Sequence, residues 1–270
     1  MRGATLVDAD GYRFMVERHP DAELAPRHVV AKAILDQPGG AWLDATHLGR
    51  QLLEAEFPTV LAGSSRLGFD LATEPVPVEP AEHYMIGGVA TDLDGATTLP
   101  GLWAAGEVAC TGVHGANRLA GNSLAQSCVF GHRAALAIAA DRELKRQRPV
   151  ADPEAPLLAE SGPSGPALQR LRHELRAAMT AGAGPLRDAA SLARAEAALQ
   201  RAEQALGPAP HADHDAIELT NMVTVGKLIV GSAQLREESR GVHWRADHPA
   251  AEPTWAGRRL RVARTAADDV

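Results

Sequence analysis

One stretch decides both the fold and the candidate site: His114-Gly115-Ala116-Asn117-Arg118-Leu119-Ala120-Gly121-Asn122-Ser123-Leu124. It places an imidazole, a guanidinium, an amide and a hydroxyl among small residues, which let the backbone approach a ligand closely. A helix is predicted to begin at Asn122 or Ser123, and the N-terminal end of a helix stabilises negative charge. The stretch therefore predicts a site for an anionic group, held between polar side chains and a helix N-terminus.

A second motif lies just upstream and reads Gly101-Leu102-Trp103-Ala104-Ala105-Gly106-Glu107. Its pattern predicts a buried strand ending in a glycine and an acid. An acid at such a strand end commonly accepts hydrogen bonds from ribose hydroxyls. Without a ligand, Glu107 would be a solvated or capping acid, and Asn122 and Ser123 would cap the helix. Both interpretations fit these residues.

Composition excludes several functional classes. The chain has 270 residues, of which 45% are hydrophobic and 23% charged, the balance of an ordinary soluble globular protein. A net charge of −7, with dispersed Lys and Arg, argues against a nucleic-acid partner. No apolar run is long enough for a membrane span, and the N-terminus does not begin a signal peptide. Cys110 and Cys128 form neither a disulfide framework nor a metal-ligand pattern, so a cytoplasmic location without a bound metal is expected.

The first third of the chain is predicted to mix strands and helices. An Asp-Gly turn between apolar runs predicts a hairpin over residues 5–15. Pro26 predicts the first turn of a helix that continues through Ile34. The further predictions are a strand over 41–45, a helix through Leu48 and Leu53 that stops before Pro58, and an extended connector over 74–80.

The remainder turns from strands to helices. Strands are predicted over 84–91 and 102–105, followed by the helix that begins near residue 122. Residues 148–166 are rich in Pro, Glu, Ser and Gly, which is typical of a linker. Apolar residues at three- and four-residue spacing then predict three helices, over 167–181, 189–206 and 213–238, that pack as a bundle.

The segment from Gly101 to Gly131 resembles the C-terminal part of the flavin domain in the fumarate reductase, succinate dehydrogenase and L-aspartate oxidase superfamily. The resemblance to L-aspartate oxidase extends over nearly the whole chain. Thr111-Gly112 before the core motif, residues 73–78 before His83, and the short helical tail favour that family. One departure is Ala125-Gln126, where the oxidases usually carry Leu-Glu.

The resemblance implies an α+β fold in four parts. These are the C-terminal part of a substrate-capping domain (1–78), the C-terminal part of a Rossmann-like FAD-binding domain (79–147), a linker (148–166) and a helical C-terminal domain (167–270). The GxGxxG motif that opens the FAD-binding domain of this family occurs nowhere in the sequence. A truncated chain is therefore expected, from a gene fragment or a mis-called start codon rather than from a partner chain that supplies the missing half.

The resemblance also implies roles for individual residues. Arg27 matches the proton-transferring Arg that faces the flavin, with His28 in place of the acid that usually follows it. His83 and Arg118 match the residues that bind the two carboxylates of the substrate. The expected cofactor is FAD, and the residues matching those that bind it are Glu107, Asn122, Ser123 and Leu124. His114 is expected to hold the loop together or to line the site. Residues 236–243 are expected to fix the helical domain through ion pairs and to approach the active site.

The reaction implied is the FAD-dependent oxidation of L-aspartate to iminoaspartate, the first step of NAD biosynthesis through quinolinate. Oxygen or fumarate would accept the electrons, and quinolinate synthase would be a functional partner. Two alternatives stay open. One is an inactive fragment or interaction module without a cofactor, and the other is a flavoprotein of the fumarate reductase or succinate dehydrogenase type.

Overall fold

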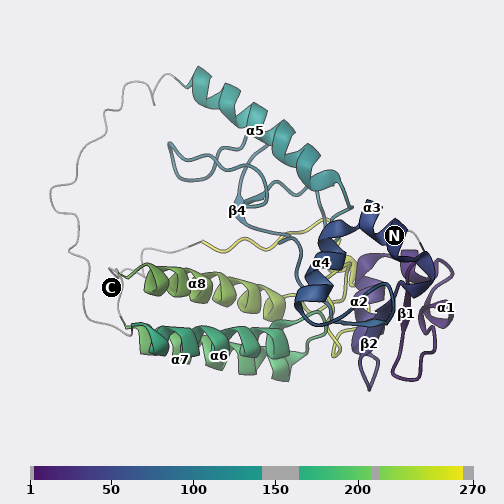
Figure 1. Ribbon diagram of the computed structural model, residues 1–270. Coiled ribbons are helices and arrows are strands. Elements are labelled where there is room, and N and C mark those ends of the chain that lie inside the picture. Colours follow the sequence, from purple (N-terminus) through teal and green to yellow (C-terminus); the bar gives the residue numbers. More distant parts are fainter. Residues whose placement is uncertain (1–2, 142–163, 208–212, 264–270) are drawn as a thin grey trace. The chain divides into compact units, whose positions relative to one another are not determined.

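The computed structural model describes residues 3–141, 164–207 and 213–263 and confirms an α+β fold (Figure 1). Contacts within the chain divide it into two compact units, Met1–His83 and Tyr84–Val270. Each unit has its own hydrophobic core, and each is described by itself below. Among the described residues, no helix is both long and apolar enough to span a lipid bilayer.

The first unit is built on a three-stranded antiparallel sheet in the order β1-β2-β3. The strands are β1 (Thr5–Val7), β2 (Ala41–Asp44) and β3 (Val76–Val78). Pro77 cannot donate a backbone hydrogen bond, and it lies in an edge strand, where no donor is needed on the outer side. The connector predicted to be extended thus becomes the third strand of the sheet.

Short helices complete the first unit. They are α1 (Met15–Arg18), η1 (Ala22–Leu24), α2 (Arg27–Leu35), η2 (Thr46–Leu48), α3 (Arg50–Glu56) and α4 (Pro58–Arg66). The helix predicted to follow Pro26 is confirmed as α2. The helix predicted through Leu48 and Leu53 is confirmed only in part, because Leu48 ends η2 and α3 begins after Gly49, whose φ is +76°. Pro58 then begins α4, because proline is tolerated in the first turn of a helix.

The predicted hairpin over residues 5–15 is wrong. Asp8 Oδ1 accepts hydrogen bonds from the backbone N–H groups of Asp10 and Tyr12, at 3.0 and 2.9 Å. This side-chain turn redirects the chain into α1, which begins at Met15. Strand β1 therefore pairs with β2 and not with the residues that follow its own turn.

The second unit opens with long loops and very little sheet. Strand β4 (Val89–Ala90) pairs in parallel with β5 (Ala109–Cys110), and helix α5 (Asn122–Ala140) follows. The strand predicted over 84–91 is reduced to two residues, after Gly87 and Gly88 with φ of +139° and +113°. The strand predicted over 102–105 is reduced to an isolated bridge between Trp103 and Ala96. The predicted helix start near residue 122 is confirmed.

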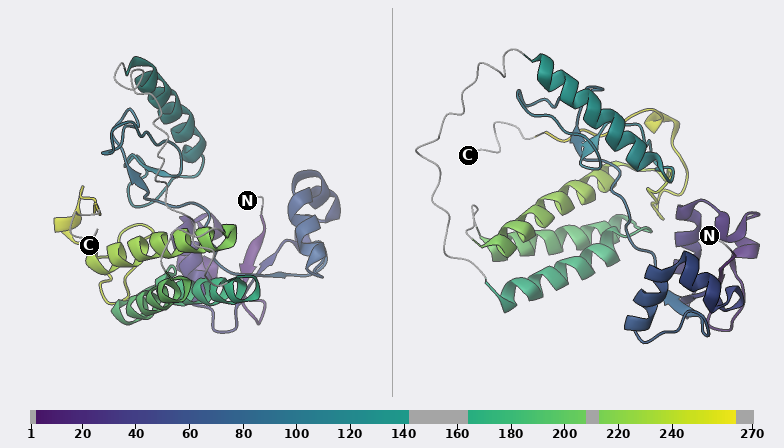
Figure 2. Two further views of the ribbon diagram at one scale, coloured as in Figure 1. Left: turned by 90° about the vertical axis from the view of Figure 1, so that its left-hand side faces the viewer. Right: turned by 45° about the horizontal axis from the view of Figure 1, so that its top comes forward.

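Three helices form the predicted bundle, and they lie side by side in every view (Figures 1 and 2). They are α6 (Pro166–Ala183), α7 (Ala189–Leu206) and α8 (His214–Leu235). Their core is drawn from their own residues, including Leu168, Leu192, Leu199, Leu219 and Val230. Helix α7 begins with a capping box, in which Asp188 and Ser191 exchange hydrogen bonds.

The domain boundaries expected from the sequence stay a prediction. Most of the expected linker, residues 148–163, lies outside the described residues. Pro166, expected to be its last residue, is the first residue of α6. After the bundle the chain continues without regular structure to the short helix η4 (Pro253–Trp255).

Candidate functional site

The site is centred on the loop that joins β5 to α5. Two successive turns shape it, with Gly115 N donating to Gly112 O and Asn117 N donating to His114 O, each at 3.2 Å. Gly112 and Gly121 have φ of +85° and +87°, a region that side-chain-bearing residues rarely adopt. Glycines thus let the loop fold tightly and deliver its polar residues to the start of the helix.

Tyr84 brings two residues of this loop together. Its hydroxyl lies 3.2 Å from Nε2 of His114, and the two rings meet edge to face with centroids 5.3 Å apart. The guanidinium of Arg118 lies over the Tyr84 ring, 4.7 Å from its centroid. An aromatic face attracts a cation, so this contact holds Arg118 in place. No hydrogen bond to the Arg118 guanidinium is found within the part of the chain that the structure describes.

Burial shifts the pKa values of the Tyr84–His114 pair. It lowers the pKa of His114, and the nearby charge of Arg118 lowers it further. Burial raises the pKa of Tyr84, with Glu107 adding to the rise and Arg118 opposing it. The neutral form of His114 is therefore favoured, and the direction of its hydrogen bond with the Tyr84 hydroxyl depends on the tautomer of the imidazole ring.

Gln126 connects this cluster to the preceding loop. Its side chain is buried on α5, its Oε1 lies 3.5 Å from the Tyr84 hydroxyl, and its Nε2 donates to Gly106 O at 3.3 Å. The sequence singled out Gln126 only as a departure from the family pattern, and it missed Tyr84 altogether. An amide suits this position because it donates on one side and accepts on the other.

Glu107 lies in a different setting from the one predicted. It does not end a strand, because it occupies a turn two residues before β5 begins. Its Oε1 accepts a hydrogen bond from Met85 N at 2.8 Å. The side chain is exposed and lies beside the segment that begins with Tyr84, so it is accessible to a ligand.

The start of α5 departs from the capping interpretation. The residue before the helix is Gly121, and no side chain caps the first turn. Ser123 Oγ is buried and has no hydrogen-bond partner among the described residues. A buried hydroxyl without a partner is costly, which favours a ligand that supplies the missing hydrogen bond. Asn122 and Leu124 are exposed on the same turn.

Arg27 belongs to the first unit, where the backbone orients its guanidinium. It begins α2 and donates to the carbonyl oxygens of Glu23 and Ala25, the latter at 2.8 Å. These carbonyls lie at the end of the short helix η1, which explains how an Arg is held in a helix turn that disfavours positive charge.

The structure brings some of the predicted residues together. Arg118 and His114 meet at Tyr84 in the second unit, on the loop that leads to Ser123. His83 is exposed and is the last residue of the first unit, which also contains Arg27.

Comparisons with known proteins identify the family of the chain. Residues 1–124 match the family described as FAD binding domain, and residues 172–268 match the family described as fumarate reductase flavoprotein C-term. The L-aspartate oxidase of Streptomyces coelicolor is 47% identical over 93% of this chain and 46% of its own length. The L-aspartate oxidase of Rhodospirillum rubrum is 43% identical over 94% of this chain and 88% of its own length.

The chain belongs to the L-aspartate oxidase family. It spans about half the length of the Streptomyces relative. Among solved structures it resembles a quinol-fumarate reductase with menaquinol molecules, with a TM-score of 0.80 and 29% identity, over 92% of this chain and 50% of that one. It also resembles Mycobacterium smegmatis Sdh1 in complex with UQ1, with a TM-score of 0.70 and 31% identity, over 94% of this chain and 46% of that one.

FAD is the cofactor of this family of oxidoreductases. The first turn of α5 in this chain carries groups that suit the binding of one part of FAD. The unpartnered Ser123 hydroxyl and the uncapped backbone N–H groups are hydrogen-bond donors at the positive end of a long helix. Such a position stabilises negative charge on a bound ring or phosphate. Asn122 N already donates to Leu119 O at 3.2 Å, so Asn122 would contribute its side chain. With the donors of Ser123 and Leu124 and the Glu107 carboxylate, it is one of the groups through which this chain would hold FAD.

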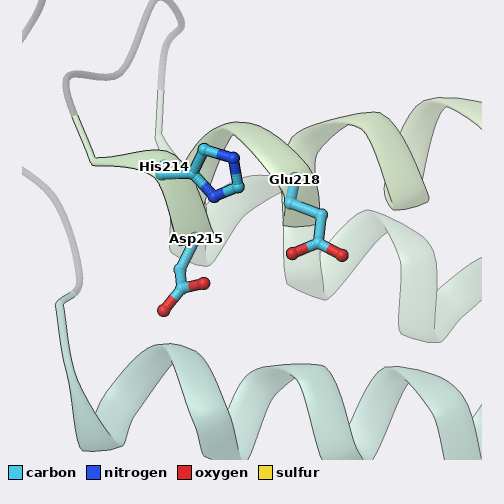
Figure 3. A group of neighbouring side chains, drawn as sticks. All are labelled: His214, Asp215 and Glu218. Carbon is cyan, nitrogen blue, oxygen red and sulfur yellow. The ribbon is translucent and has the colours of Figure 1, made fainter.

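One cluster outside this site has the composition of a metal site. His214, Asp215 and Glu218 lie at the start of α8, with potential ligand atoms within 4.8 Å of one another (Figure 3). All three side chains are exposed. Arg172 pairs with Glu218 at 2.9 Å and with Asp215 at 3.4 Å, so a side-chain cation already occupies the space between both carboxylates. We therefore assign no metal to this cluster.

Proposed function

We propose that this chain forms the C-terminal part of an FAD-dependent L-aspartate oxidase, which oxidises L-aspartate to iminoaspartate and reduces oxygen or fumarate. The observation that carries the proposal is the loop around Arg118. The Arg118 guanidinium has no hydrogen-bond partner among the described residues and stacks on Tyr84. Ser123, whose buried hydroxyl has no partner among them either, follows in the sequence at the start of α5. Quinolinate synthase, the expected consumer of iminoaspartate, is the functional partner that this proposal implies.

In the proposed reaction the Cα–H bond of L-aspartate breaks as a hydride and the amino group loses a proton, which leaves a C=N bond. FAD, when bound, supplies the two-electron acceptor. Arg118 would bind one carboxylate of L-aspartate through paired N–H donors, and His83 would bind the other. Two fixed carboxylates orient Cα, and orientation of this kind contributes much of the rate of an enzyme reaction.

Arg27 would act in the direction of fumarate reduction, in which a proton is delivered to carbon. The carbonyl oxygens of Glu23 and Ala25 hold its guanidinium at the start of α2 before any substrate arrives. Glu107, Asn122, Ser123 and Leu124 would hold the cofactor, as their positions beside β5 and in the first turn of α5 allow.

A second candidate function is a fumarate reductase. One component of the fumarate reductase (CoM/CoB) of Methanothermobacter marburgensis is 36% identical over 94% of this chain and 50% of its own length. Both functions need a site for two carboxylates, so the choice of electron donor separates them. An oxidase is reduced by L-aspartate, whereas a reductase of this kind is reduced by another donor and reoxidised by fumarate.

The decisive experiment is a flavin titration of the full 270-residue chain, followed by anaerobic addition of L-aspartate. Bound flavin that bleaches with L-aspartate supports the oxidase. Arg118→Lys should abolish the bleaching, because Lys cannot form the bidentate contact. The control is Arg201→Lys, the same change at an exposed position on α7. Bound flavin that only fumarate reoxidises would favour the reductase, and failure to bind flavin would refute both for this chain.

A further inference from the structure

A buried acid lies just after the bundle, in a turn that contacts the candidate site. Glu238 is completely buried, and both of its oxygens are occupied. Arg236 donates to Oε1 from Nε at 2.8 Å, and Arg240 donates to Oε2 from its terminal nitrogen at 2.9 Å. The backbone N–H of Glu252 completes the set at 2.9 Å. Two cations and one backbone donor thus hold this carboxylate in a single position.

The same turn is fixed from its outer side. The guanidinium of Arg236 lies over the Trp255 ring, 5.2 Å from its centroid. Arg240 donates to the carbonyl oxygen of Glu252 at 3.0 Å. Glu238 therefore connects the end of α8 to the segment around η4 and leaves the intervening turn little freedom.

This fixed turn touches the candidate carboxylate-binding loop. Val242 N donates to Ala116 O at 2.9 Å. Gly241 has φ of +60°, and a Cβ at that position would overlap the Ala116 carbonyl oxygen. Only glycine allows this approach, because any side chain would push the turn away from the loop. Ala116 lies between His114 and Arg118, the two residues of this loop that contact Tyr84.

We propose that Glu238 is a positioning residue, which holds the Gly241–Val242 turn against Ala116 and thereby fixes Arg118 for binding a substrate carboxylate. The inference rests on the proposed function, because it takes Arg118 as the carboxylate-binding residue. It makes the segment after the bundle part of the substrate site, although Glu238 touches neither substrate nor cofactor.

Hydrogen exchange tests the physical link without cofactor or substrate. In Glu238→Gln, we expect amides in residues 240–243 and 112–118 to exchange at least about tenfold faster, because a neutral side chain leaves two partly buried cations without their buried counter-charge. The control is Glu237→Gln, the same change at the exposed neighbouring residue, which should exchange like the unaltered chain. Unchanged exchange at 112–118 in Glu238→Gln would overturn the proposal.

Gly241→Ala tests the same link without touching the ion pairs. Its added methyl group should separate the turn from Ala116, so exchange at 112–118 should rise while residues 236–238 stay protected. Protection of α6–α8 in the same data shows whether either variant has lost its fold. If the bundle unfolds in Glu238→Gln, the Gly241→Ala result decides, and unchanged exchange at 112–118 would again overturn the proposal.

A kinetic comparison tests the consequence for the substrate. In the flavin-loaded chain, Glu238→Gln should raise the L-aspartate concentration for half-maximal flavin reduction by about tenfold. The limiting rate and the flavin affinity should stay within about twofold of those of the unaltered chain, because Arg118 is misplaced while the contacts to the cofactor are kept. An unchanged half-saturating concentration, or a loss confined to flavin affinity, would overturn the positioning role. If the unaltered chain is not reduced by L-aspartate, the proposed function fails, and the exchange data still decide the link between Glu238 and the loop.

Discussion

Arg13 reaches Glu23 through two hydrogen bonds, from Nε to Oε1 at 2.9 Å and from the terminal nitrogen to Oε2 at 2.6 Å. Leu6 N donates to the same carboxylate at 3.1 Å, and the Glu23 side chain is buried. The backbone carbonyl of Glu23 is also an acceptor for Arg27. The pair therefore connects strand β1 to the residue proposed to transfer a proton.

Glu23→Gln should lower the free energy of unfolding of the first unit by about 2 kcal/mol, because hydrogen bonds to a charged group are lost in a buried position. The hydrogen bond from Arg13 lowers the pKa of Glu23, so this stabilisation should also fade as the pH falls below the ordinary carboxyl range. Urea denaturation at pH 7 and pH 4 would measure both effects. Glu54→Gln, which alters an exposed pair on α3, should change stability by less than about 0.5 kcal/mol.

Two substitutions separate the contributions of Tyr84. Tyr84→Phe removes the hydroxyl bonded to His114 but keeps the ring beneath Arg118, so we expect a loss of about 1 kcal/mol in stability. Tyr84→Leu also removes the ring and should raise the half-saturating concentration of L-aspartate further. Chemical denaturation and flavin-reduction kinetics would test the pair. Equal kinetics in the two variants would show that the ring does not hold Arg118.

Gln126→Glu restores the acid usual in the family, yet we expect it to destabilise this chain. A carboxylate cannot donate to Gly106 O, so that carbonyl would face a buried negative charge, at a cost of about 2 kcal/mol at pH 7. The destabilisation should shrink toward pH 4, where the new carboxyl becomes protonated. Denaturation curves at the two pH values would detect this, and a pH-independent effect would contradict the explanation.

The sequence predicted the helices well because their signals are local. Pro26 at the start of α2 and the apolar spacing of the bundle were sufficient. The predicted hairpin failed because the Asp8 side chain forms its own turn, which competes with strand pairing. The predicted strand before Glu107 is wrong, because among the described residues this run forms only an isolated bridge at Trp103 and leaves Leu102 47% exposed.

The candidate site was predicted only in part. Arg118 and Ser123 could be found because they lie in one motif. Tyr84 and Gln126 are 42 positions apart, and they meet only through the packing of α5 on the loops before it. Neither residue has a local pattern that predicts such a contact, and the link from Glu238 to Ala116 depends in the same way on distant segments.

Acid should release the segment that follows the bundle. The hydrogen bond from Arg240, with others from Glu252 N and Arg236, lowers the pKa of Glu238 to about 2, below its ordinary value of 4.5. A lowered carboxyl pKa stabilises the fold fully above the ordinary value and loses that effect as the pH falls toward the lowered one. We therefore expect that lowering the pH from 4.5 to 2 reduces the melting temperature of Glu238→Gln markedly less than that of the unaltered chain. Thermal scans by circular dichroism would measure it, and identical pH profiles would contradict it.

Ser123→Ala should separate cofactor binding from folding. Removing a buried hydroxyl that lacks a partner should leave the stability of the flavin-free chain unchanged or slightly higher. Flavin affinity should fall by about fivefold, since one hydrogen bond to the ligand is lost. Fluorescence titration and denaturation of the same samples would show this, whereas unaltered affinity would exclude Ser123 from the flavin site.

The bundle core draws its buried residues from 168–233, whereas the cores of the first unit draw theirs from 6–71, with none in common. Cooperative melting requires shared packing, and here the two sets of packed side chains are separate. A calorimetric scan should therefore resolve more than one heat-absorption peak. The melting behaviour of the chain would then need at least two temperatures to describe it.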